Sequence, residues 1–177
     1  MSINTSNNAT LIEQVNILFR SSISGGLSNI FAAWMIFVLV YKTPYTNSAL
    51  LLGTIVTTIT IIRVLVTESY LRKQSLSLKT SLGIYLFFTF LVGMAWGAFV
   101  YTQGLYGDEE IRNIVFLINF GLIAGSIAIL SAWMPAFILY VLPQAAAIFY
   151  VFLHLDYERN YFIALTFFIF MAVMFST

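Results

Sequence analysis

The residues of this chain that could do chemistry are few, and the most suggestive group surrounds its single histidine. His154 is followed at two-residue spacing by Asp156 and Glu158. An imidazole with two carboxylates is a ligand set that divalent metals accept, but a working site needs further converging donors and supporting hydrogen bonds to its ligands. The three residues fall in a short polar connection between apolar runs, where a solvated turn explains them better. We therefore predict no metal site.

Other catalytic arrangements are missing. The chain has no cysteine, and none of its seven acidic residues falls inside a long apolar run. No nucleophile has a base at a plausible spacing. Proton- or ion-coupled transport is disfavoured for the same reason, because it generally needs an ionisable carboxylate or histidine at mid-membrane. We expect no catalytic residue and no cofactor in this chain.

Two amide side chains and one indole lie deep within apolar runs. Pro143 falls in the middle of one run, where it should kink a helix and release a backbone carbonyl. Gln144 follows it directly, and Asn119 lies in the preceding run. With Trp96, these amides are the candidate ligand-binding residues of a polar pocket. The alternative is simple hydrogen bonding between helices, worth about 0.6 kcal/mol per contact.

Arg63 is the only formally charged residue well inside an apolar run. A charge at the centre of a membrane helix costs about 2.5–3.5 kcal/mol on insertion scales. Near the inner boundary its guanidinium could reach the headgroups or pair with Glu68. A pairing with Asn119 or with a bound anion is the alternative. With Arg72 and Lys73, Arg63 is predicted to anchor the topology.

The elements that carry these residues are membrane helices. The composition is 60% hydrophobic and 8% charged, whereas soluble domains have about 25% charged residues. The fold class is therefore all-α, a polytopic bundle of six transmembrane helices with a short amphipathic segment before it. Six runs approach the roughly 20 residues needed to cross hydrocarbon. They cover residues 22–41, 48–67, 82–101, 113–130, 133–153 and 161–177. The fourth and fifth nearly touch, so a different division around Pro135 is possible.

The N-terminal segment, residues 1–21, is expected to lie in the membrane interface. Apolar residues recur in it at three- and four-residue spacing, at Leu11, Ile12, Val15, Leu18 and Phe19. The chain would then turn at Gly25–Gly26 into the six-span domain, residues 22–177. The alternative is a plain extension of the first helix. The last run ends at Thr177 without a basic anchor, which suggests a fragment of a longer protein.

Basic residues orient the bundle. Lysine and arginine favour the cytoplasmic side, and the second connection holds Arg72, Lys73 and Lys79. The third connection is acidic, with Asp108 and two glutamates. We therefore expect both termini in the cytoplasm.

Small residues four apart mark the third and fourth runs, at Gly93 and Gly97 and at Gly121 and Gly125. Such pairs let helix backbones approach closely, so these two runs are expected to pack together. The alternative is a dimer face or a mobile helix pair. With Pro143, these glycines are the candidate hinge residues.

These features together resemble the N-terminal membrane-embedded sensory regions of bacterial signalling proteins. The resemblance rests on Ile62-Arg63, on Arg72 in a basic connection, on Gly93-Met-Ala-Trp96-Gly97, and on the run from Gly121-Leu-Ile-Ala-Gly125-Ser126 through Pro135 to Pro143. Those regions precede histidine kinase, diguanylate cyclase or cyclic-di-GMP phosphodiesterase modules. The resemblance implies two-component or cyclic-di-GMP signalling, six helices with cytoplasmic termini in the bacterial inner membrane, a last helix leading to an output module, and a homodimer. No output module and no ligand carry over.

The functional expectation is a sensory input domain that converts a ligand or a membrane state into helix movement. Its partners would be the lipid bilayer and a small hydrophobic ligand; with a net charge of +1 there is no surface suited to nucleic acid. The alternatives are a small transporter or channel subunit, and a purely structural subunit. A polar file from Thr54, Thr57 and Thr58 through the buried amides would favour transport, a blind pocket would favour sensing, and a bundle without a cavity would favour structure.

Overall fold

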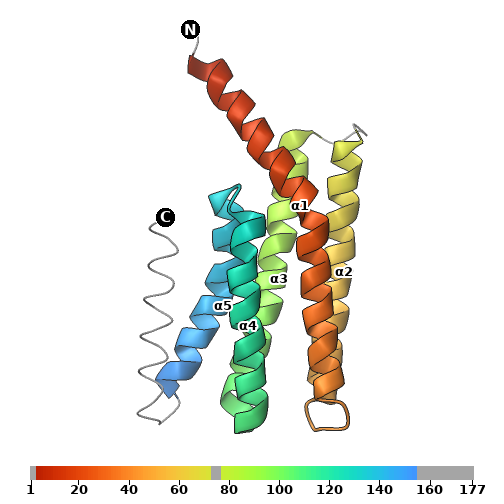
Figure 1. Ribbon diagram of the computed structural model, residues 1–177, viewed down its shortest axis with the longest axis vertical. Coiled ribbons are helices and arrows are strands. Elements are labelled where there is room, and N and C mark those ends of the chain that lie inside the picture. The colour runs from red at the N-terminus through yellow and green to blue at the C-terminus, as the bar shows by residue number, and fades with distance from the viewer. Residues whose placement is uncertain (1–2, 73–76, 155–177) are drawn as a thin grey trace.

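The computed structural model describes residues 3–72 and 77–154, with side chains from residue 10 onward. Its described part is all-helical (Figure 1), with α1 (Ile3–Leu39), α2 (Thr46–Leu71), α3 (Leu78–Tyr106), α4 (Glu109–Leu130) and α5 (Met134–His154). The predicted sixth span, residues 161–177, lies outside the described residues. So do Lys73, Asp156 and Glu158.

The first five predicted spans are confirmed as helices. Over the described residues, all five helices are long and apolar enough to cross a membrane. Their ends follow local chemistry: Ser77 Oγ accepts the Thr80 amide before α3, and Asp108 Oδ1 accepts the Ile111 amide before α4. A turn after Leu130 separates α4 from α5, which confirms the division of this region into two helices.

The first helix differs from the expectation. It runs without interruption through Gly25 and Gly26, so the predicted turn there is wrong and the extended-helix alternative is confirmed. A helix of 37 residues is about 55 Å long, well beyond the roughly 30 Å of a bilayer core. Accordingly, the N-terminal part of α1 projects past the other helices at one end of the bundle (Figure 1).

Successive helices run up and down the bundle (Figure 1). The beginning of α1, the end of α2, the beginning of α3 and the α4–α5 turn lie toward one end. The α1–α2 and α3–α4 connections lie at the other end, with the C-terminal end of α5. This alternation matches the order of crossings expected from the sequence.

The closest helix packing joins α3 to α5, not α3 to α4 as expected. A methyl group at Gly93 would collide with the carbonyl oxygen of Tyr140, and one at Gly97 would lie 2.8 Å from the carbonyl oxygen of Pro143. At Gly104 it would meet a valine of α5 at 2.7 Å. Glycine is required at Gly93 and Gly97 because the two backbones nearly touch there, whereas Gly104 makes room for the Val151 side chain. We call this contact the α3–α5 seam.

The two glycines of α4 play a different part. A methyl group built at Gly121 or at Gly125 would have no neighbour within 4 Å. The expectation that these glycines pack against α3 is therefore wrong. They border open space beside α1.

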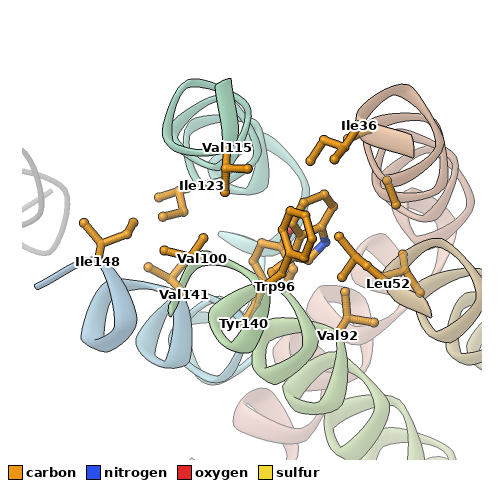
Figure 2. Close-up of a cluster of buried hydrophobic side chains, with 14 of the residues drawn as sticks. Ile36, Leu52, Val92, Trp96, Val100, Val115, Ile123, Tyr140, Val141 and Ile148 are labelled. Atoms are coloured by element: carbon orange, nitrogen blue, oxygen red, sulfur yellow. The ribbon is translucent and has the colours of Figure 1, made fainter. Parts of the chain in front are cut away.

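Apolar side chains lie both on the outside of this bundle and in its interior. Large apolar side chains point outward, with Leu117 exposed by 74% and Phe31 by 71%. The interior combines an apolar core with buried polar groups. Figure 2 shows Trp96 at the centre of that core, with Ile36 of α1 on one side and Val115 of α4 on the other. The larger buried polar side chains are Asn29, Arg63, Gln103, Asn119 and Gln144.

Candidate ligand-binding site

A pocket of about 180 Å³ lies between α1 and α4. One wall is formed by Gly25, Ser28 and Asn29 of α1, and the opposite wall by α4 residues between 121 and 130. Arg63 of α2 and Tyr140 of α5 complete the lining. These last two are buried, whereas Ser28 and the two glycines of α4 are exposed, so the pocket opens between α1 and α4. We call it the Arg63 pocket.

The space exists because α1 and α4 touch at one level and diverge at another. At the contact, a methyl group at Gly25 would lie 2.9 Å from Cγ2 of Ile129, and the Ser21 hydroxyl donates to the Ile129 carbonyl at 3.1 Å. Toward the other end of α4, Gly125 and Gly121 have no side chain to fill the gap. The pocket therefore forms where the contacts of α1 with Ile129 end and the glycines of α4 begin.

Arg63 is the charged member of this site. Its side chain is only 3% exposed, its guanidinium carbon lies 5.3 Å from the centre of the Tyr85 ring, and its Nε has no hydrogen-bond partner among the described residues. A methyl group at Gly26 would lie 3.6 Å from Nη2, so that glycine leaves room for the guanidinium. The expected Glu68 partner is taken, because Glu68 pairs with Arg72 at 3.0 Å.

The direction of the Arg63 side chain also differs from the expectation. Helix α2 continues to Leu71, eight residues or about 12 Å beyond Arg63. A side chain that reaches headgroups extends out of the bundle, whereas this one points inward and is buried. The alternative pairing with Asn119 is not formed, since the described hydrogen bond of that amide goes to Gln144.

Asn29 connects the pocket to the core, and it was not among the residues expected to form a site. Its Oδ1 accepts two hydrogen bonds, from Trp96 Nε1 at 2.9 Å and from the Tyr140 hydroxyl at 2.8 Å. Its Nδ2 donates to the Gly25 carbonyl at 2.8 Å. One side chain of α1 thus joins α3 and α5. The sequence feature that could have indicated this role is the position of Asn29 inside an apolar run, four residues after Gly25.

The three predicted ligand residues do not line the pocket. Asn119 Nδ2 donates to Gln144 Oε1 at 3.0 Å, and Gln144 Nε2 donates to the Tyr140 carbonyl at 2.7 Å. Both amides are fully buried, so their hydrogen bond between α4 and α5 matches the simpler alternative. Trp96 is also fully buried in the core, and it reaches the pocket only through Asn29.

The predicted hinge residues divide into two groups. Gly121 and Gly125 line the Arg63 pocket. Gly93, Gly97 and Pro143 belong to the α3–α5 seam. Tyr140 is common to both, because its ring lines the pocket while its carbonyl contacts Gly93.

The chemistry available at this site is recognition. Its lining contains one guanidinium, one amide and the hydroxyls of Ser28, Ser126 and Tyr140, without a carboxylate or an imidazole to act as a base. Across the described residues, no three metal-ligating side chains converge. No family model, curated protein or solved structure matches this chain.

Proposed function

We propose that this chain is a membrane-embedded sensory domain, in which occupation of the Arg63 pocket changes the packing of α1 against the rest of the bundle. The observation that carries the proposal is a pocket lined by the buried guanidinium of Arg63, whose Nε has no hydrogen-bond partner among the described residues, and joined by Asn29 to the core. A purely structural bundle would have no use for such a pocket, because a cavity and an unpaired charge both reduce stability.

Membrane insertion is part of this proposal. All-round apolar helices are typical of membrane spans, and the outward position of residues such as Leu117 and Phe31 agrees with contact to lipid. The hydrogen bonds between buried side chains, such as Asn119 with Gln144 and Trp96 with Asn29, agree as well, because in a bilayer polar groups are paired inside the bundle. In water the same outward residues would expose a large apolar surface.

Sensing is favoured over transport by the threonines of α2. Thr54 and Thr58 are exposed, and their hydroxyls donate to carbonyls of their own helix. Thr57 accepts a hydrogen bond from Trp34 Nε1 at 3.0 Å. These threonines therefore do not form a polar file with the buried amides Asn119 and Gln144.

A sensor needs two packings that the ligand binds unequally. The α3–α5 seam supplies a rigid unit, since no side chain separates its backbones at Gly93 and Gly97. Helix α1 is held to this unit by Asn29, through Trp96 and Tyr140. A ligand that spreads α1 from α4 would strain these two hydrogen bonds. The movable element is therefore α1, with Asn29 as its link to the seam.

The signalling context remains the one suggested by the family resemblance. We propose a homodimer in the bacterial inner membrane with cytoplasmic termini, which passes its signal to a histidine kinase or a cyclic-di-GMP module. The position of the beginning of α1 and the end of α2 toward the same end of the bundle supports a common side for them. Fusion of the chain to a dimer-dependent output module would test this context, with ligand-dependent output as the expected result.

The conformational proposal can be tested by distance measurements between spin labels. The chain has no cysteine, so Leu27→Cys with Leu117→Cys places labels on exposed sites of α1 and α4. Phe87→Cys with Leu142→Cys labels α3 and α5 as the control. A pocket ligand should shift the α1–α4 distance distribution and leave the control pair unchanged. Unchanged distances for both pairs at saturating ligand would refute the sensory proposal.

A further inference from the structure

We propose that the Arg63 pocket binds an amphiphilic monocarboxylate, with the carboxylate on the Arg63 guanidinium and the apolar body between α1 and α4. This inference rests on the proposed function, and it names the chemical class of the ligand. It is drawn from the charge on Arg63, the hydrogen bonds of the other polar groups in the pocket, and the apolar residues of the walls.

The first observation is the missing negative charge. Arg63 is almost completely buried, and the one ion pair among the described residues, between Arg72 and Glu68, does not involve it. The Tyr85 ring offers a cation–π contact, which does not supply an acceptor for the N–H groups. A buried guanidinium needs an anion or several acceptors. Its planar fork fits the two oxygens of a carboxylate.

The second observation limits the ligand to one negative charge. The hydroxyl donors of the pocket are occupied: Ser28 Oγ donates to the Ser24 carbonyl, Ser126 Oγ to the Ile123 carbonyl, and the Tyr140 hydroxyl to Asn29. Asn29 Nδ2 donates one of its two N–H groups to the Gly25 carbonyl, so the guanidinium is the one charged donor group for a ligand among the described lining residues. A phosphate, with more oxygens and more charge, would leave acceptors unsatisfied, whereas a carboxylate would not.

The third observation concerns the body of the ligand. The rest of the lining consists mainly of the apolar residues Leu122, Ile129 and Leu130, together with glycines. A volume of about 180 Å³ is slightly larger than the roughly 150 Å³ cavity known to hold benzene. The pocket can thus hold a carboxylate with a short apolar body. A longer chain would leave through the opening beside Ser28 and Gly121 toward the surrounding lipid.

Two sources share this chemistry: a short water-soluble acid and a long-chain acid dissolved in the bilayer. The test uses the full chain in nanodiscs of zwitterionic lipid, so that the membrane contributes no net charge. Hexanoate is titrated from water, and decanoate is added with the lipid. Hexanol serves as the uncharged analogue and inorganic phosphate as the anion without an apolar body. Binding of hexanoate, decanoate and hexanol is measured from the ¹³C chemical shift of their labelled oxygen-bearing carbon. Thermal stabilisation is measured for these three compounds and for phosphate.

We expect saturable binding of at least one of the two acids, with hexanol and phosphate at least tenfold weaker, a difference of about 1.4 kcal/mol or more. Binding of hexanoate alone would indicate a water-soluble ligand, and binding of decanoate alone a ligand from the bilayer. Equal affinity for hexanoate and hexanol, equal affinity for phosphate, or no binding of either acid would overturn the inference.

Three variants identify the site. Arg63→Met should weaken acid binding at least tenfold, while Arg63→Lys should retain part of it, because the charge remains and the fork is lost. Gly125→Leu fills the pocket and keeps the arginine, so it should abolish binding of the acid through its body. Unchanged acid binding in both Arg63→Met and Gly125→Leu would place the acid elsewhere and refute the assignment.

The outcome is separable from that of the proposed function. Acid binding without a change of the α1–α4 label distances would support the ligand class and refute sensing. A shift of the α1–α4 label distances with a different ligand, together with no acid binding, would support sensing and refute the ligand class.

Discussion

Replacing Asn29 by leucine removes the acceptor for two buried donors while keeping a side chain of similar size. Trp96 Nε1 and the Tyr140 hydroxyl both donate to Asn29 Oδ1, at 2.9 and 2.8 Å, and all three side chains are buried. Hydrogen bonds between helices in a membrane protein are worth about 0.6 kcal/mol on average and about 1.7 kcal/mol at most. Loss of two such bonds predicts that Asn29→Leu lowers the free energy of unfolding by about 1.2–3.4 kcal/mol.

The assay is reversible unfolding in mixed micelles, followed by far-ultraviolet circular dichroism so that changes at tryptophan do not interfere. The same substitution is then made in a Trp96→Phe, Tyr140→Phe background, where neither donor exists. There Asn29→Leu should cost much less, because no donor is left unpaired. An equal cost in both backgrounds would refute the reasoning, since it would mean that the loss comes from packing alone.

Five further substitutions test the other contacts. Gly93→Ala should destabilise the fold by about 1–3 kcal/mol, because the added methyl group overpacks the α3–α5 seam. Gly125→Ala should be nearly neutral, because its methyl group faces open space. Equal unfolding midpoints for the two variants would contradict this. Gln144→Leu and Asn119→Leu should each lower the free energy of unfolding by about 0.6–1.7 kcal/mol. The double variant should lose less than the sum of the two, because one hydrogen bond joins these side chains. Additive losses in a double-mutant cycle would argue against that bond. Arg63→Met should keep or raise the unfolding midpoint in the absence of ligand, because it removes a buried charge that has no ion pair among the described residues. A decrease of the unfolding free energy by more than about 2 kcal/mol would mean that the guanidinium has partners in the folded protein.

The positions of the helices could be predicted because they depend on composition along the chain. Runs of about 20 apolar residues bounded by polar connections make membrane-length helices whatever their neighbours. The capping residues Ser77 and Asp108 are local signals of the same kind. The continuation of α1 through Gly25 and Gly26 was harder to foresee, because glycine pairs mark both turns and close helix contacts.

The candidate site could be predicted only in part, because pairing between helices is not encoded in the apolar pattern. Gly93 and Gly121 carry the same local signature, yet one contacts a backbone carbonyl and the other borders a pocket. Arg63 was recognised as unusual, but its direction depends on where Gly26 and Tyr85 lie in space. Asn29 was missed because its two donors come from helices much later in the chain.

That separation in sequence has a consequence for biosynthesis. The Tyr140 hydroxyl that bonds to Asn29 belongs to a residue 111 positions later in the chain. At about 5–20 residues per second, the ribosome needs about 6–22 s to supply it. During this interval α1 has an amide without its final partners. With the membrane location proposed above, the first helix would be held at the insertion machinery, pair temporarily with α2, or enter the lipid with that amide unsatisfied. The α4–α5 hairpin therefore completes the contacts of α1, and nascent chains truncated before α5 should be the most readily degraded.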